Sequence, residues 1–406
     1  MRAQLKASTD GSSALRGMPL LSYGFRLFFL LAAGWALVAM LTLFAGLALR
    51  AWPAGAPLLG RWHGHEMLFG FVAAAIAGFL LTAVPTWTSS QPVRGPVLAM
   101  LGALWLAGRV VMSPWLGMEG TAWTLLDAVF FPAVAVAIGI SLVRARNYRN
   151  FQFMLLLLLL ALADFLFLTG QLGWITALGF DPLRLAANLV MLMIAVVGGR
   201  IVPLFTRNAL LARGAQCAIA PLPWLERAAL AAVAAVVIGD VVIPDTAAAG
   251  WSAAVAALLL AARMSRWHGH RTLSLPIVWI LHAGYAWVVV ALALKAAWVL
   301  TAAPWAANWL HALTAGAFGT MVLGVMTRVA LGHTGRPLVV AKPVSAAYVL
   351  AIAGAALRVV APAAAPAYYV ELMSAALLAW AGAFAIFLVV YTPILLAPRA
   401  DARASS

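Results

Sequence analysis

Long apolar runs, separated by short polar segments, make up most of this chain. A helix needs about 20 apolar residues to cross the hydrocarbon core of a bilayer, and about twelve runs approach or exceed that length. They lie near residues 27–49, 66–88, 95–113, 122–143, 151–173, 184–206, 224–243, 248–264, 275–300, 308–331, 343–361 and 368–396. The pattern predicts an all-α polytopic membrane protein of about twelve transmembrane helices. We expect one integral domain over residues 22–397, with tails at 1–21 and 398–406.

Composition and charge support this fold class. Of the 406 residues, 65% are hydrophobic and 9% are charged, whereas about a quarter are charged in a soluble domain. The formal charge of +15 would favour a nucleic-acid partner in a soluble protein. Here most cations fall in alternate short connections, as the positive-inside rule describes, so we expect a lipid bilayer and no nucleic acid as the partner, with both termini cytoplasmic. These cations are Arg2, Lys6, Arg16, Arg26, Arg94, Arg144, Arg146, Arg149, Arg207, Arg213, Arg263, Arg266, Arg271, Arg336, Lys342, Arg399 and Arg403.

The string Arg61-Trp62-His63-Gly64-His65-Glu66-Met67 concentrates ionisable groups at the outer mouth of the second run. Such groups are costly near hydrocarbon, so they need a partner, a metal or water. Residues two apart on a helix point about 200° away from each other. If the helix begins before His63, then His63 and His65 could serve two cofactors on opposite flanks. If the chain is still extended there, both could chelate one ion.

Imidazole chemistry makes these histidines candidate metal ligands. Neutral imidazole suits haem iron, copper and zinc, and Met67 adds a soft ligand that favours copper. His311 begins the tenth run at the same outer level, and haem in a helical bundle is commonly held from two helices. The alternative is that the histidines bind lipid headgroups and water at the membrane surface. The sequence leaves both interpretations open.

Two neighbours of the histidines could assist a cofactor. Glu66 could orient an imidazole or transfer protons, or it could simply be a carboxylate favoured at the start of a helix. Arg61 could pair with a haem propionate, because guanidinium groups recognise carboxylates.

The inner ends of the sixth and tenth runs carry a second polar group of residues. Arg200 follows Gly198-Gly199, and Arg328 and His333 end the tenth run. A second haem or an anion could bind here, and the glycines would allow a neighbour or a planar ligand to approach closely. Positive-inside anchoring explains such cations without a ligand. His311 and His333 are roughly 33 Å apart along a helix, so they cannot share one site.

Two more residues lie within predicted spans. Asp164 is in the middle of the run at 151–173, where it could be a proton relay or a structural partner of Thr169 or Gln171. His282 lies a turn or two inside the run at 275–300 and is either a further metal ligand or a hydrogen-bonded core histidine.

Spacings within the chain hint at an internal repeat. His65 is followed by glycines five and thirteen residues later, and so is His311. The second, sixth and tenth runs also share short strings, and they are four runs apart. We therefore predict three four-helix units around a pseudo-threefold axis.

Several strings resemble the NnrS family, which comprises haem- and copper-containing bacterial membrane proteins linked to nitric oxide. They are Gly24-Phe25-Arg26, Trp62 to Met67, Gly78 to Pro85, Gly198 to Asn208, His311 to Thr314, Met326 to Arg328 and Leu331 to Arg336. Leu27 and Thr86 depart from the family, which usually has proline and asparagine at these points. Thr86 therefore lacks the side-chain amide that the family usually has at this point.

The resemblance implies haem, copper and a role in nitric oxide handling or nitrosative stress in the bacterial inner membrane, without fixing a reaction. We expect nitric oxide or another small apolar gas as the ligand, with a quinol or other electron donor if the protein is an oxidoreductase. The cofactor candidates are His63, His65, His311, His333, Arg61, Arg200 and Arg328; the metal-ligand candidates add Met67 and His282, and the proton-transfer candidates are Glu66 and Asp164. The alternatives are a twelve-helix transporter with midplane pockets at Asp164 and Arg200, or a non-catalytic sensor or assembly factor.

Overall fold

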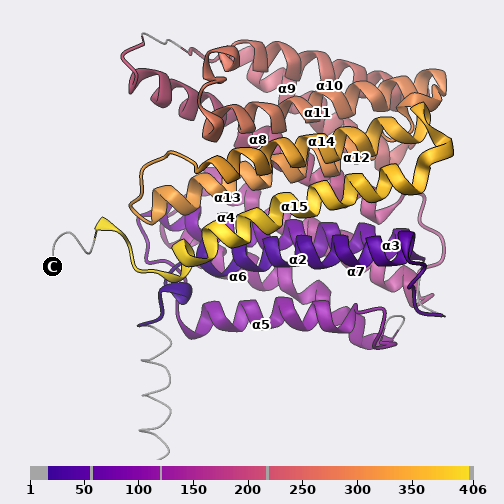
Figure 1. Cartoon of the computed structure of the whole chain (residues 1–406), viewed down its shortest axis with the longest axis horizontal. Helices are drawn as coiled ribbons and strands as arrows, with labels where there is room; N and C mark the ends of the chain where they lie inside the picture. Colours follow the sequence, from indigo (N-terminus) through magenta and orange to yellow (C-terminus); the bar gives the residue numbers. More distant parts are fainter. Residues whose placement is uncertain (1–16, 55–57, 119–120, 216–218, 402–406) are drawn as a thin grey trace, which may run out of the picture.

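The computed structural model describes residues 17–54, 58–118, 121–215 and 219–401. Most of the predicted tail at 1–21, the end of the tail at 398–406, and Cys217 therefore lie outside the described residues. Over the described ranges every regular element is a helix, as the sequence predicts. The long helices lie side by side in one bundle (Figure 1).

Each predicted apolar run corresponds to a helix or to helical segments joined end to end. The longer helices are α2 (Gly24–Ala48), α3 (Leu59–His65), α4 (Ala73–Thr88), α5 (Pro96–Val111), α6 (Phe130–Arg144), α7 (Phe151–Gln171), α8 (Pro182–Leu211), α9 (Pro223–Val242), α10 (Ala247–Ser265), α11 (Pro276–Thr301), α13 (Gly319–His333), α14 (Lys342–Ala364) and α15 (Tyr369–Leu396). The shorter segments are η1 (Pro19–Leu21), η2 (Glu66–Val72), η3 (Ala122–Val129), η4 (Tyr148–Asn150), η5 (Gly269–Thr272), η6 (Pro304–Ala306), α12 (Trp309–His311), η7 (Ala312–Phe318) and η8 (Pro366–Tyr368).

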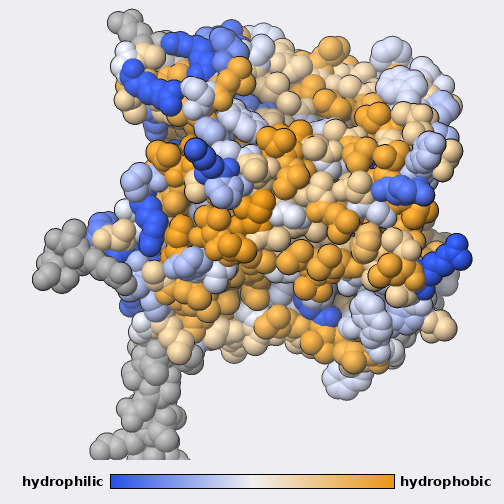
Figure 2. Space-filling view, viewed as in Figure 1, coloured by the Kyte–Doolittle hydropathy of each residue, from blue (hydrophilic) through white to orange (hydrophobic). Residues whose placement is uncertain are grey.

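Ten helical segments of the described chain are long and apolar enough to cross a membrane. Two helices fall outside that set: α5 has 16 residues, and α9 carries Glu226, Arg227 and Asp240 within 20 residues. The protein is thus a polytopic membrane protein, and the count of twelve crossings stays a prediction. Figure 2 shows hydrophobic residues over the middle of the bundle and hydrophilic residues gathered at the two ends of the helices, as contact with a bilayer requires.

Local sequence explains where several helices begin. Proline occupies the first turn of α5, α8, α9 and α11, where its missing N–H costs no hydrogen bond. The side chain of Asp181 accepts a hydrogen bond from the backbone N–H of Leu183 and so caps α8. Thr246 caps α10 in the same way, through the N–H of Ala249.

The two ends of the described chain lie at the same end of the bundle. A guanidinium nitrogen of Arg26, near the start of α2, donates hydrogen bonds of 2.6 Å to the carbonyls of Leu395 and Ala397, at the end of α15. Burying this arginine ties the first helix to the last and satisfies carbonyls that the end of α15 leaves free. We call this end of the bundle the terminal end and the other the distal end.

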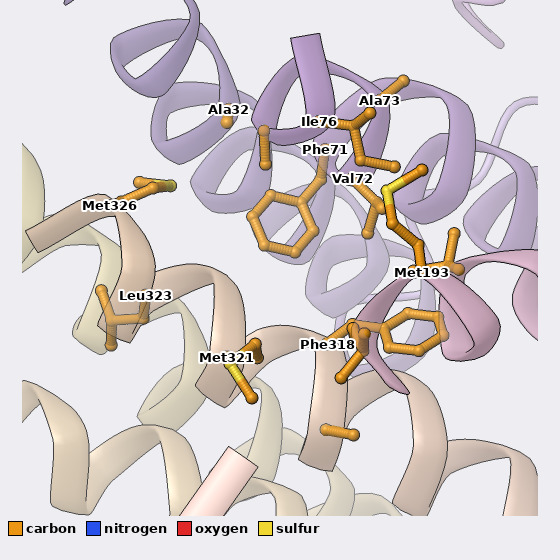
Figure 3. Close-up of a cluster of buried hydrophobic side chains, with 14 of the residues drawn as sticks. Ala32, Phe71, Val72, Ala73, Ile76, Met193, Phe318, Met321, Leu323 and Met326 are labelled. Carbon is orange, nitrogen blue, oxygen red and sulfur yellow. The ribbon is translucent and has the colours of Figure 1, made fainter. Parts of the chain in front are cut away.

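Three helices, α4, α8 and α13, surround the centre of the bundle. Apolar side chains such as Ile76, Met193 and Met326 meet there (Figure 3). A cavity of about 80 Å³ remains between the three helices, and it is lined entirely by hydrophobic residues. These are the second, sixth and tenth predicted runs, so the sequence strings they share mark the helices at the centre.

Two of these runs contain the same backbone feature, a π-helical segment. Directly after His65 and directly after His311, the helix widens to π geometry over η2 and η7. The backbone carbonyl of Gly70 accepts a hydrogen bond from the indole of Trp105, and the carbonyl of Ala315 accepts one from Trp380. A π segment shifts the backbone hydrogen-bond register, and these indoles satisfy carbonyls in the shifted region.

Glycine makes room for a tryptophan in both segments. A Cβ atom at Gly70 would overlap the indole of Trp35, and one at Gly316 would overlap the indole of Trp287. The equal glycine spacing after the two histidines therefore reflects equal packing. The corresponding helix α8 is α-helical throughout, so this device is shared by two of the three predicted units and the pseudo-threefold axis stays a prediction for the third.

Candidate functional site

The helix of the second run begins at Leu59, before both histidines of the distal mouth. His63 and His65 therefore project from opposite flanks of α3, because residues two apart on a helix point about 200° away from each other. His65 is fully buried, and His63 is half-buried. The sequence left open whether the two histidines lie on opposite flanks of a helix or on an extended chain. The structure has them on opposite flanks, in separate environments.

His65 lies between two carboxylates. Its Nδ1 is 3.0 Å from Oε1 of Glu66, and its Nε2 is 3.0 Å from Oδ1 of Asp164 on α7. A third carboxylate, Asp127 on η3, has an oxygen 3.4 Å from the same Nε2. Asp164 is thus the partner of an imidazole rather than of Thr169 or Gln171; the hydroxyl of Thr169 donates to the carbonyl of Phe165 in its own helix.

Arg109, near the end of α5, completes this cluster. Its guanidinium donates to Glu66 at 2.6 Å and to Asp127. Glu66, Arg109, Asp127 and Asp164 are all at most 3% exposed, so these charges are compensated by one another rather than by water. Such a cluster is costly to bury, and in membrane proteins it commonly marks a functional site.

The cluster brings together atoms suited to a metal ion. One ligand atom each from His65, Asp127 and Asp164 lie within 4.8 Å of one another. An imidazole nitrogen with carboxylate oxygens is a donor set compatible with copper(II), zinc or iron. Three carboxylates against one guanidinium also leave an excess of negative charge that a cation would balance.

Arg61 covers the distal side of this cluster. Its guanidinium lies 5.2 Å from the ring centroid of Phe167, and the same ring stacks on the imidazole of His65 at a centroid distance of 4.9 Å. Arg61 is exposed, so it acts on the buried imidazole only through the phenyl ring. Met67 points elsewhere and packs, partly buried, against the hydrophobic core.

The opposite flank of α3 faces the tenth run. His63 and His311 are close enough to interact electrostatically, and Arg358 on α14 interacts with both. Both histidines are half-buried, and neither makes a hydrogen bond among the described residues. The Nδ1 atom of His63 is buried without any partner. An imidazole nitrogen in that state is free to take a ligand.

Arg358 is held in place by a reciprocal contact with the chain before His311. Its guanidinium donates at 3.0 Å to Oδ1 of Asn308, and the amide of Asn308 donates to the carbonyl of Val359. No carboxylate among the described residues pairs with Arg358. The guanidinium is therefore a donor available to an anionic group beside the two histidines.

A second buried polar cluster lies at the corresponding place in the next unit. Asp240 on α9 pairs with Lys295 on α11 and accepts a 2.7 Å hydrogen bond from the amide of Asn188 on α8. Both clusters contain residues from the second and third helices of one unit and from the first helix of the next, and the His65 cluster adds Asp127 from the fourth helix of its unit. This shared placement supports the predicted repeat of units, although no histidine occurs in the second cluster.

The terminal-end candidates belong to neither distal group. His333 packs against Phe25 at a ring-centroid distance of 5.6 Å, and Arg328 lies 3.7 Å from the centroid of Phe205. His282 is hydrogen-bonded through Nε2 to the hydroxyl of Thr206 at 2.8 Å. Arg200 is exposed. The structure thus brings His63 and His311 together, and His65, Glu66 and Asp164 together, but does not bring His282, His333 or Arg328 to either group.

Sequence reasoning missed four residues of these clusters: Asp127, Asn188, Asp240 and Arg358. Asp127, Asp240 and Arg358 are ionisable residues within or at the end of an apolar run, which is a signal in itself. Asn188 gives a weaker signal because it is neutral. Arg109 and Lys295 complete the two clusters, because both are buried in ion pairs.

Comparison with known families gives one match that covers nearly the whole chain. Residues 19–399 match the family model described as NnrS protein. A search of curated proteins returned no match.

Proposed function

Because this chain belongs to the NnrS family, we propose that it is an inner-membrane haem and copper protein that binds or turns over nitric oxide, or keeps it from other iron centres. The observation that carries the proposal is that His63 and His311, from helices far apart in the sequence, lie close enough at the distal end of the bundle to interact electrostatically. Buried polar groups normally make hydrogen bonds, so two imidazoles without a partner among the described residues are not explained by packing. They are good ligands for a metal.

The residues present fit a haem at this flank of α3. His63 and His311 would hold the iron, and Arg358 would pair with a propionate, because guanidinium binds carboxylate through paired hydrogen bonds. A bound haem supplies an iron centre that can bind diatomic gases and exchange single electrons. The absence of any carboxylate partner for Arg358 among the described residues supports this assignment.

The residues on the other flank fit a copper ion. His65, Asp127 and Asp164 would hold it. Glu66 would orient the imidazole of His65, and Arg109 would orient the carboxylate of Asp127. Since His63 and His65 are two residues apart on one helix, the two metal centres would be linked through α3.

Without a bound metal ion, the His65 cluster can instead transfer a proton. An imidazole can accept a proton at one ring nitrogen and release another from the second. Here the two nitrogens contact Asp164 and Glu66. A reaction that reduces nitric oxide takes up protons, and this arrangement would carry one from the α7 side of His65 to Glu66 without exposing a charge to lipid.

The central cavity suits a small apolar gas. The pocket of about 80 Å³ between α4, α8 and α13 has only hydrophobic walls, and an apolar site of this size suits a small apolar guest. Nitric oxide is small and apolar, so it partitions into lipid and could enter this space from the bilayer.

Transport is less well supported. A transporter would be expected to have midplane pockets at Asp164 and Arg200, but Asp164 is enclosed by its cluster and Arg200 is exposed at the terminal end. A non-catalytic sensor would have the same ligands as an enzyme. It would be recognised by bound haem without consumption of nitric oxide.

The test is absorption spectroscopy with metal analysis on purified wild type and on His63→Ala, His311→Ala, His65→Ala and His270→Ala. We expect His63→Ala and His311→Ala to lose or shift the haem bands, and His65→Ala to lose copper while keeping haem. His270 is exposed, so His270→Ala is the control and should match wild type. A wild-type protein that is folded, colourless and metal-free would refute the proposal.

A further inference from the structure

A pocket of about 270 Å³ opens at the terminal end of the bundle, between α8, α9 and α10. It is separate from both distal groups, and no step of the proposed function uses it. Its walls include four arginines, Arg200, Arg207, Arg263 and Arg266, and one carboxylate, Glu226. With one negative charge against four positive ones, the pocket has a net charge of +3 at neutral pH.

Three of these four cations have no partner among the described residues. Only Arg263 pairs with Glu226. The side chains of Arg200, Arg207 and Arg266 make no hydrogen bond or ion pair among the described residues, and the neighbouring undescribed residues 216–218 are Gln, Cys and Ala. Arg200 is also close enough to Arg149 and Arg263 for mutual repulsion. Like charges held together in this way favour an anion between them.

Hydrogen bonds hold Arg263 at the floor of the pocket. Arg263 is 3% exposed, and its guanidinium donates to the carbonyl of Ala195 at 2.8 Å and to the hydroxyl of Tyr285 at 3.0 Å. A Cβ atom at Gly199 would overlap this guanidinium, so the glycine lets the planar group lie against α8. The close approach that the sequence predicted at Gly199 is therefore made by a side chain of the protein itself.

The pocket also has apolar walls. Leu204, Ile219, Leu222 and Trp267 line it beside the arginines. Guanidinium groups bind phosphate oxygens through paired hydrogen bonds, and the apolar walls suit the glycerol and upper acyl region of a lipid. Basic pockets between membrane helices on the cytoplasmic side are known to bind anionic headgroups.

We propose that this pocket binds a phosphate group, with Arg200, Arg207 and Arg266 as its ligands. The phosphate can come from the headgroup of an anionic phospholipid in the adjacent leaflet or from free phosphate in solution. The inference does not depend on haem or copper.

The test measures thermal unfolding of the full-length protein in neutral detergent during separate titrations with phosphatidylglycerol, inorganic phosphate and phosphatidylcholine. A ligand that binds only the folded state raises the unfolding temperature in a saturable way. We expect saturation by phosphatidylglycerol or by inorganic phosphate and none by phosphatidylcholine. A response to phosphatidylglycerol alone identifies the lipid as the source, and a response to both identifies the phosphate itself as sufficient.

The variant Arg200→Gln/Arg207→Gln should need a much higher ligand concentration for half-saturation, by about tenfold for each charged hydrogen-bonding group removed. Arg144→Gln is the control, because Arg144 is an exposed cation at the same end and lies outside the pocket. Arg266→Gln alters only an exposed residue and keeps the test usable if the double variant does not fold. The proposal is overturned if neither phosphatidylglycerol nor inorganic phosphate gives a saturable response. It is also overturned if Arg144→Gln and the pocket variants respond equally.

Discussion

The Nε2 atom of His65 lies 3.0 Å from Oδ1 of Asp164, although 99 positions separate the two residues in the chain. This contact joins the second predicted run to the fifth and gives the buried carboxylate its partner. The imidazole of His65 points away from that of His63 across α3. The two histidines of one short motif therefore contact different parts of the bundle.

Arg109 should be essential for stability, because it is the only fixed cation in the His65 cluster. Arg109→Gln leaves Glu66 and Asp127 without their partner, and removing one member of a buried ion pair costs about 3–5 kcal/mol. Unfolding of the purified protein in detergent would measure this. Arg94→Gln, at an exposed position before α5, should change stability by less than about 0.5 kcal/mol. Similar losses for the two variants would contradict a structural role for the cluster.

The second polar cluster allows a matched comparison of two aspartates. Asp240→Ala leaves Lys295 buried and unpaired, with an expected loss of about 3–5 kcal/mol. Asp245 pairs with Arg184 at the surface, where its side chain is 57% exposed, so Asp245→Ala should cost no more than about 1 kcal/mol. Denaturation monitored by tryptophan fluorescence distinguishes the two. If Asp245→Ala is the more damaging substitution, the assignment of the buried pair fails.

Glycine packing in the two π segments gives a third prediction. Gly70→Ala and Gly316→Ala place a methyl group against the indoles of Trp35 and Trp287, and such overpacking costs about 1–3 kcal/mol. Because these glycines follow His65 and His311 by five residues, metal content should fall with stability. Gly34 on α2 has open space around it, so Gly34→Ala should be neutral or stabilising, by up to about 1 kcal/mol. Thermal unfolding and metal analysis on the three variants check both expectations.

The single cysteine tests the predicted topology. Cys217 lies outside the described residues, in the connection between α8 and α9. We predict that this connection is cytoplasmic, because the helices alternate in direction and two cations, Arg207 and Arg213, lie at the end of α8 and directly after it. A membrane-impermeant maleimide should label Cys217 only after the inner membrane is permeabilised, and the variant Cys217→Ser should not be labelled at all. Labelling of intact spheroplasts would reverse the orientation.

The sequence by itself determined the fold class and the position of every long helix. An apolar run of about 20 residues has few alternatives to a membrane helix, because its backbone polar groups must be satisfied within the segment. The glycine spacing after His65 and His311 also predicted a real likeness, since the same π geometry follows both histidines. Family membership followed from strings spread along the whole chain.

Only the tertiary structure decided which ionisable groups meet. Partners such as His65 and Asp164, or Arg109 and Asp127, are set by how helices rotate and pack against one another, and apolar runs carry little information about rotation when they are buried on several sides. The first turns of the second helix were also undetermined, because its polar start at Leu59 falls before the apolar run. The seven residues of α3 make about two helical turns and place His63 and His65 on opposite flanks, whereas a helix that began later would have placed both imidazoles elsewhere.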